Sequence, residues 1–287
     1  MKILLNNTNT HHKNLNALRK YNIQLVEIND SNLNKFDLSQ FDAVYSPGVP
    51  LDVTKYPNTK FIFGPHFSVF PNENINMING IRKNVAYNLL SNWVVNYWKE
   101  YPICNNLNFI KLPFGVDTIR FNEIMKPQDK NIIFIYYKSR NPTELQQLLE
   151  FLSKYNFNIK VFNYISRYSE TEYLECLHNA MFGIWLGCHE SQGFALEEAL
   201  SCNVPLLVWN VTSMNQEYGY DYQDIPATSI PYWDERCGEV FYSITELPSK
   251  FYIFINNLQK YKPRDFILEN LSINVCGNRF IEFINNM

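Results

Sequence analysis

The run from Asn131 to Tyr137 restricts the fold of this chain more than any other segment. It reads Asn-Ile-Ile-Phe-Ile-Tyr-Tyr and is continuously apolar from Ile132 onward, with β-branched and aromatic side chains. A strand with one face in water alternates apolar and polar residues, whereas a strand buried on both faces is apolar along its length. The run therefore predicts a central strand of a parallel sheet that helices cover on both sides.

Short apolar runs alternate with helical patterns along the chain, which is the order typical of parallel α/β folds. Before residue 125 the predicted strands span 2–5, 23–28, 43–45, 60–63 and 109–112, with helices from residue 13 and over 87–99. Beyond it the predicted strands span 131–137, 159–162, 180–187 and 204–209, with helices over 143–155, 170–179, 194–202 and 263–285. The charged, proline-containing stretch 125–131 indicates a boundary between domains. We expect a first Rossmann-like domain over 1–125, a second over 126–262 and a C-terminal helix over 263–287.

The composition is that of an ordinary globular protein and carries no nucleic-acid signal. Of the 287 residues 46% are hydrophobic and 18% charged, and the net charge of −3 predicts no basic face for nucleic acid. Six cysteines are scattered without a Cys-x-x-Cys pair, which favours a reducing compartment over a disulfide framework. No apolar run has the length of a signal peptide or a transmembrane segment. We expect a cytoplasmic protein, while peripheral membrane contact stays open.

Two glutamates flank a predicted strand-to-helix turn and indicate the chemistry of the chain. Glu190 follows the strand 180–187, and Glu198 lies two turns into the helix 194–202, with Gly193 between them. The amino terminus of a helix directs N–H groups towards anions and often holds phosphate. A carboxylate accepts hydrogen bonds from two adjacent hydroxyls, such as those of a ribose. The pattern therefore predicts a nucleotide-sugar site, and the alternative is that both glutamates are solvated charges near a helix end.

Four segments resemble a known family. The runs 168–177 and 182–209 contain the two glutamates with seven residues between them, followed by Asn-Val-Pro. The turn Pro113–Phe121 contains Gly-Val-Asp and a later phenylalanine, and Ser91-Asn-Trp-Val opens a helix. These segments resemble the retaining GT-B glycosyltransferases, also called glycosyl transferases group 1, most strongly over roughly residues 130 to 245. The resemblance implies two Rossmann-like domains that face each other across a cleft, with a C-terminal helix able to pack back on the first.

The resemblance also assigns roles around the two glutamates. It implies that Glu190 meets hydroxyls of the donor sugar and that Glu198 binds the ribose hydroxyls of the nucleotide. The sugar and diphosphate would be held by Ser191, Gln192, Gly193 and Phe194, with backbone N–H groups from 192 to 194 taking part. The nucleobase would lie on the loop after the strand 159–162, at Tyr164, Ile165 and Arg167.

A basic residue that follows the strand 131–137 is expected to bind the diphosphate. Negative charge grows on the leaving phosphate as the glycosidic bond breaks, so a fixed cation there lowers the barrier. The sequence departs from the family because no glycine precedes Arg140 and Thr143 stands where a second lysine is common. We favour Arg140 and keep Lys138 as a further candidate, with a solvated loop charge as the alternative for each. His66, after the strand 60–63, matches a family histidine that faces the donor sugar.

Two further histidine regions leave alternatives open. His11 and His12 follow the first strand, where the family has glycines near the acceptor, and their contact with an acceptor stays open. Cys188 and His189 adjoin Glu190, but no third or fourth ligand follows at a usual spacing, so no metal site is predicted.

The leading hypothesis is a glycosyltransferase that moves a sugar from a nucleoside-diphosphate-sugar to a hydroxyl of a glycan or another acceptor. The resemblance implies retention of configuration, no metal ion and no cofactor besides the donor. One alternative is a nucleotide-sugar epimerase or hydrolase on the same scaffold. Another is a catalytically silent protein that binds a sugar nucleotide or a glycan. The sequence does not identify the sugar, the base, the acceptor or the oligomeric state.

Overall fold

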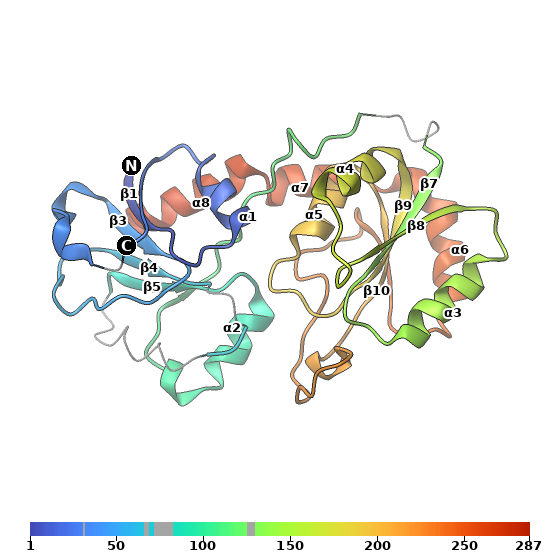
Figure 1. Cartoon of the computed structure of the whole chain (residues 1–287), viewed down its shortest axis with the longest axis horizontal. Coiled ribbons are helices and arrows are strands. Elements are labelled where there is room, and N and C mark those ends of the chain that lie inside the picture. The colour runs from blue at the N-terminus through green and yellow to red at the C-terminus, as the bar shows by residue number, and fades with distance from the viewer. Residues whose placement is uncertain (31, 66–68, 72–82, 125–129) are drawn as a thin grey trace. The chain divides into compact units, whose positions relative to one another are not determined.

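A computed structural model describes residues 1–30, 32–65, 69–71, 83–124 and 130–287 of the chain. The chain divides into two compact units, residues 1–115 with 273–287 and residues 116–272 (Figure 1). Each unit contains one parallel sheet with helices, which confirms the predicted α/β class and its two Rossmann-like domains. The segments 116–124 and 263–272 lie in the second unit, whereas the sequence analysis placed them in the first domain and in a separate C-terminal helix.

The first unit is built on a six-stranded parallel sheet in the order β2-β1-β3-β4-β5-β6. Its strands are β1 (Lys2–Asn6), β2 (Gln24–Ile28), β3 (Ala43–Ser46), β4 (Phe61–Phe63), β5 (Val85–Asn88) and β6 (Phe109–Ile110). Its helices are α1 (His12–Leu18), α2 (Asn92–Lys99) and α8 (Ile273–Asn286). The predicted helix over 87–99 was wrong in its first residues, because Tyr87 lies in β5 between Phe63 and Phe109 of the neighbouring strands.

The last helix of the chain completes the core of the first unit. Phe280 on α8 lies 5.9 Å from the ring of Tyr21 and 5.5 Å from the ring of Tyr45, measured between ring centroids. Gly277 allows this approach, since an added Cβ would lie only 3.0 Å from the ring of Tyr21. The predicted single helix over 263–285 is divided in two, and only its second part packs on the first unit.

The second unit contains a five-stranded parallel sheet in the order β11-β10-β9-β7-β8. Its strands are β7 (Ile132–Tyr137), β8 (Asn158–Asn163), β9 (Ala180–Leu186), β10 (Leu206–Trp209) and β11 (Gly238–Phe241). Its helices are α3 (Pro142–Leu152), α4 (Glu170–Asn179), α5 (Phe194–Ser201), α6 (Leu247–Asn257) and α7 (Pro263–Asn270). Sequence analysis missed β11 and α6.

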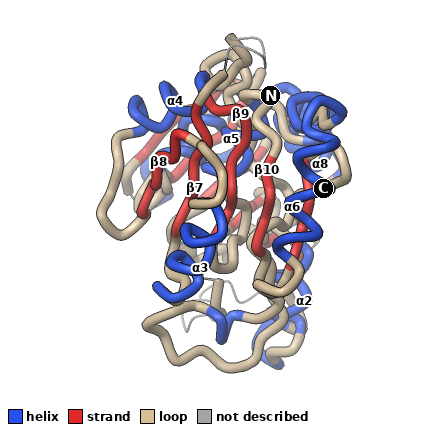
Figure 2. The backbone as a smooth tube through the Cα atoms, turned by 90° about the vertical axis from the view of Figure 1, so that its right-hand side faces the viewer, coloured by secondary structure: helices blue, strands red, loops and turns tan. Residues whose placement is uncertain are grey.

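Helices cover both faces of this second sheet, as the apolar run of β7 predicts. Ile133 and Ile135 face a core that α3 and α6 close, and Figure 2 looks onto that side. Phe134 and Tyr136 face the other way, where both rings contact Tyr173 of α4. Among the described residues, no helix combines the length and apolar character that crossing a membrane requires.

Candidate functional site

The site begins where β7 and β9 end side by side. The two strands are parallel neighbours, with Tyr137 opposite Leu186, so the segments that leave them emerge at one edge of the sheet. Lys138 follows β7 directly, and its N–H donates to the carbonyl of Leu186 at 3.0 Å. Glu190 lies on the loop that leaves β9, where its N–H donates to the carbonyl of Thr228 at 3.0 Å. Strand order therefore brings together two residues that are far apart in the sequence.

Lys138 and Glu190 form a half-buried ion pair at this edge. The Nζ of Lys138 lies 2.7 Å from Oε1 of Glu190, and their side chains are 18% and 16% exposed. The Nζ also lies 4.8 Å from the ring centroid of Tyr164, a favourable position for a cation. Burial on its own lowers the pKa of Lys138, but the carboxylate of Glu190 outweighs it and the pKa lies above the usual range. Lys138 is therefore charged, and part of its side chain stays exposed at this edge of the sheet.

A left-handed turn leads from Glu190 into α5. Gly193 caps the helix with φ of 94° and ψ of 51°, a conformation that residues with a Cβ rarely adopt. The helix then runs from Phe194 to Ser201, close to the predicted span of 194–202. Gln192 lies inside the protein, where its Nε2 donates to Oε2 of the fully buried Glu197 at 2.9 Å. This internal bond holds the turn and leaves the start of α5 next to Glu190.

Glu198 lies in the second turn of α5 and is 5% exposed. Burial is the largest cause that raises the pKa values of Tyr168 and Tyr173, that of Tyr168 to about 12, and the charge of Glu198 raises both further. The hydroxyl of Tyr173 donates to the carbonyl of Ala195 at 2.8 Å, which ties α4 to the first turn of α5. Glu198 is therefore a buried carboxylate on a braced helix, which contrasts with the solvated helix-end charge that was the alternative.

Arg140 has different surroundings from Lys138. Its guanidinium is 1% exposed and pairs with Glu144, with Nε–Oε2 at 2.9 Å and Nη2–Oε1 at 2.6 Å. Its Nη1 donates to the carbonyl of Gly187 at 3.1 Å, just after β9, and to that of Trp209 at 2.9 Å, the last residue of β10. Of these four hydrogen bonds, two join Arg140 to Glu144 of α3 and two hold the ends of β9 and β10 together.

The remaining predicted residues lie in three places. Tyr164, Ile165 and Arg167 occupy the loop that leaves β8, with Tyr164 50% and Ile165 71% exposed. Ser191 and Phe194 are half-buried on either side of Gly193. His66 lies outside the described residues. His11 and His12 follow β1 as expected, and Nδ1 of His11 accepts from the N–H of Lys13 at 3.3 Å to cap α1.

The structure also assembles a cluster that the sequence analysis did not foresee. Cys188 and His189 leave β9 just before Glu190, and Glu217 approaches them from the long connection between β10 and β11. Nδ1 of His189 lies 3.1 Å from Oε2 of Glu217. Cys188 and His189 are adjacent in the sequence, but no spacing in the sequence indicates that Glu217 lies beside them.

Comparisons with known proteins identify the architecture. No protein-family model and no curated protein match the chain. Sucrose-phosphate synthase from Thermosynechococcus elongatus matches with a TM-score of 0.56 and 9% identity, over 100% of this chain and 98% of that one. TarM from S. aureus, solved with fondaparinux, alpha-GlcNAc-glycerol and UDP, matches with a TM-score of 0.54 and 15% identity. That match covers 88% of this chain, which spans 57% of the length of TarM.

A third solved structure agrees with these two. WaaG, a glycosyltransferase involved in lipopolysaccharide biosynthesis, matches with a TM-score of 0.50 and 11% identity over 99% of each chain. Likeness at such identities shows the fold, and the function has to be argued from the site. The chain has the GT-B fold, built from two Rossmann-like domains.

Proposed function

We propose that this protein is a glycosyltransferase that transfers a sugar from a nucleoside-diphosphate-sugar to a hydroxyl of a glycan or another acceptor. The observation that carries the proposal is the Lys138–Glu190 pair at the carboxyl edge of the second sheet. It lies next to the start of a helix whose second turn holds the buried carboxylate of Glu198. The GT-B fold of the chain agrees with this proposal.

The proposed donor contacts follow from the chemistry of each group. The ammonium of Lys138 binds the diphosphate, and the start of α5 at Gly193 adds backbone N–H groups and a favourable dipole. Glu190 accepts hydrogen bonds from hydroxyls of the donor sugar, and Glu198 accepts from the ribose. We assign the diphosphate to Lys138 in preference to Arg140, because the guanidinium of Arg140 is buried and occupied by protein groups.

The proposed reaction breaks the bond between the anomeric carbon and the phosphate oxygen and forms one to the acceptor oxygen. The acceptor proton passes to the leaving phosphate, whose growing charge Lys138 stabilises. By the resemblance to retaining GT-B enzymes, we propose retention of configuration without a protein nucleophile and with Lys138 in the place of a catalytic metal ion. All six cysteines are buried thiols, which supports a reducing, cytoplasmic compartment.

The proposal is tested by donor binding and turnover with UDP-, GDP-, ADP- and dTDP-sugars. A matching donor should raise the melting temperature by mass action, and Glu198→Gln should weaken its binding by roughly 10- to 100-fold, since hydrogen bonds to a charged group contribute about 1.5–3 kcal/mol. Glu175→Gln, an exposed glutamate on α4, is the matched control and should bind as the wild type does.

Glu190→Gln separates the proposed transferase from its alternatives. It should retain nucleotide binding and lose sugar transfer to an acceptor. Release of nucleotide at the same rate with and without acceptors would favour an epimerase or hydrolase. Donor binding without turnover in the wild type would favour a silent binding protein, and a melting temperature that no donor or free nucleotide raises would contradict the nucleotide-sugar site.

A further inference from the structure

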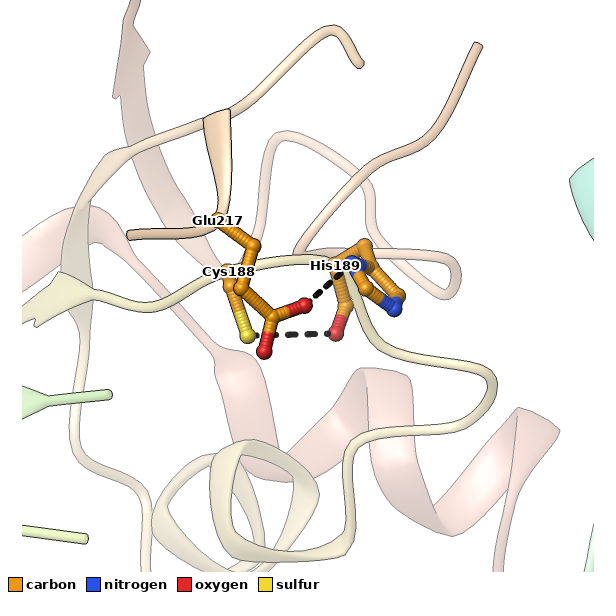
Figure 3. Close-up of side chains that lie close together, drawn as sticks. All are labelled: Cys188, His189 and Glu217. Atoms are coloured by element: carbon orange, nitrogen blue, oxygen red, sulfur yellow. Dashed lines mark hydrogen bonds and ion pairs between the residues drawn. The ribbon is translucent and has the colours of Figure 1, made fainter. Parts of the chain in front are cut away.

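Three potential metal ligands meet beside the proposed donor site. Sγ of Cys188, a ring nitrogen of His189 and a carboxylate oxygen of Glu217 all lie within 4.8 Å of one another. Figure 3 shows the sulfur next to the carboxylate, with Nδ1 of His189 turned towards it and the second ring nitrogen turned away. Cys188 is 1% exposed, and the side chains of His189 and Glu217 are each 11% exposed. The three groups form a compact and largely buried set.

We propose that Cys188, His189 and Glu217 bind one zinc ion. Thiolate, imidazole and carboxylate are the ligands that zinc takes in proteins, at bond lengths of roughly 2.0–2.3 Å. Around a tetrahedral ion such ligand atoms lie about 3.3–3.6 Å apart, by the geometry of those bonds. The nitrogen and oxygen of this cluster are already 3.1 Å apart, and the whole set fits within 4.8 Å. The separations therefore have to change by at most about 1.5 Å for the set to close around an ion.

The thiolate and the neutral imidazole of this ligand set favour zinc over harder metal ions. A thiolate discriminates against magnesium and calcium, which prefer oxygen ligands alone. The imidazole is neutral and able to coordinate, because burial and then Lys138 lower the pKa of His189 to about 4. Burial raises the pKa of Cys188 to about 12, so zinc binding would displace the thiol proton and tighten as pH rises. Three protein ligands leave a fourth position for water.

The proposed ion would join two loops that shape the donor site. Cys188 and His189 belong to the loop that carries Glu190, and Glu217 belongs to the connection after β10. These segments already touch through the backbone, because the N–H of Glu190 donates to the carbonyl of Thr228 at 3.0 Å. Zinc would reinforce this arrangement and hold Glu190 in place.

The test is a zinc titration of protein first stripped with a chelator, followed against a chromophoric competitor and checked by elemental analysis. The wild type should bind one zinc per chain. Cys188→Ser and the near-isosteric Glu217→Gln should each lose more than about 100-fold in affinity, because even an outer-shell partner is worth about 10- to 100-fold. Cys176→Ser, which alters another buried thiol of the same unit, is the matched control and should bind normally.

Cobalt gives a second readout that is independent of affinity. A cobalt-loaded wild type should show a sulfur-to-metal charge-transfer band that Cys188→Ser lacks and Cys176→Ser keeps. A wild type without bound zinc, or equal zinc affinity in Cys188→Ser, would overturn the proposal and leave a hydrogen-bonded cluster. Circular dichroism checks the fold, and Glu217→Gln carries the test if the serine variant is unfolded. No sugar donor enters the titration, so its outcome is independent of the proposed transferase activity.

Discussion

The side chains at the carboxyl ends of the strands differ between the two sheets. In the first unit, β1, β3 and β5 end on Asn6, Ser46 and Asn88, which are all buried and uncharged. Asn88 exchanges two hydrogen bonds with the backbone of Leu112, at 2.9 Å to its carbonyl and 2.8 Å from its N–H. In the second unit, the segments after β7 and β9 place Lys138 against Glu190 instead.

This difference indicates what each strand end is able to do. Buried amides and hydroxyls bonded to backbone groups of the same unit shape the backbone and offer little to a charged ligand. A half-buried ion pair keeps charges that a diphosphate and a sugar are able to engage. We therefore propose that the donor binds in the second unit, and the following experiments test that contrast in order of decreasing expected effect.

Removing the charge of Lys138 should have the largest effect. Lys138→Gln is expected to lower kcat by about 10²–10³, the usual loss when one preorganised group at a developing charge is removed. Steady-state release of nucleotide from the matching donor measures this. Lys111→Gln, which alters the lysine after β6 of the first unit, should leave the rate unchanged. Equal rates for Lys138→Gln and the wild type would remove this cation from the mechanism.

Removing Arg140 should lower the free energy of unfolding, in addition to any effect on the reaction. Arg140→Gln removes the ion pair with Glu144 and the hydrogen bonds to two buried carbonyls. We therefore expect a loss of about 3 kcal/mol in the free energy of unfolding, as for a broken buried ion pair. Urea denaturation measures the loss. Arg120→Gln breaks an exposed pair with Glu170 and should cost about 0.5 kcal/mol or less. If Arg140→Gln left the stability unchanged but weakened donor binding, the diphosphate would be assigned to Arg140 instead of Lys138.

Acid should destabilise the metal-stripped protein through His189. Its pKa is about 4 in the folded protein against an ordinary value of 6.5 for histidine, so stability is fully present above pH 6.5 and falls as pH drops towards 4. The loss between pH 7 and pH 5 should reach about 2 kcal/mol. Burial raises the pKa of Glu217, which opposes this trend at the acidic end. His189→Gln should flatten the dependence, and an unchanged slope would contradict this account.

The smallest effect is expected at the turn into α5. Gly193→Ala has room for its Cβ, with nothing closer than 3.6 Å, so its cost is the left-handed backbone, about 1 kcal/mol. Gly219→Ala also has positive φ and no atom within 4 Å of its Cβ. Both variants should lose similar stability by thermal denaturation, but only Gly193→Ala should weaken donor binding. Equal donor affinity in the two would show that the turn does not contact the donor.

Much of the fold was predictable because it follows from local patterns. The apolar run of β7 predicted a strand buried on both faces, and the run 194–202 predicted a helix close to the observed α5. Segment Val85–Asn88 was missed because four buried residues with a helix close behind carry no distinct period. The division of the C-terminal helix was missed because its two parts pack on different units.

The paired glutamates and their turn were visible in the sequence, since strand, glycine and helix adjoin there. The contrast between Lys138 and Arg140 was not. Lys138 meets Glu190, whereas Arg140 pairs with Glu144 four residues on and donates to Gly187 and Trp209. Strand order brings Glu190, Gly187 and Trp209 beside these two side chains. Glu217 meets Cys188 and His189 for the same reason. Local sequence specifies backbone conformation and burial, whereas the partner of a charged side chain depends on contacts between segments distant in the chain.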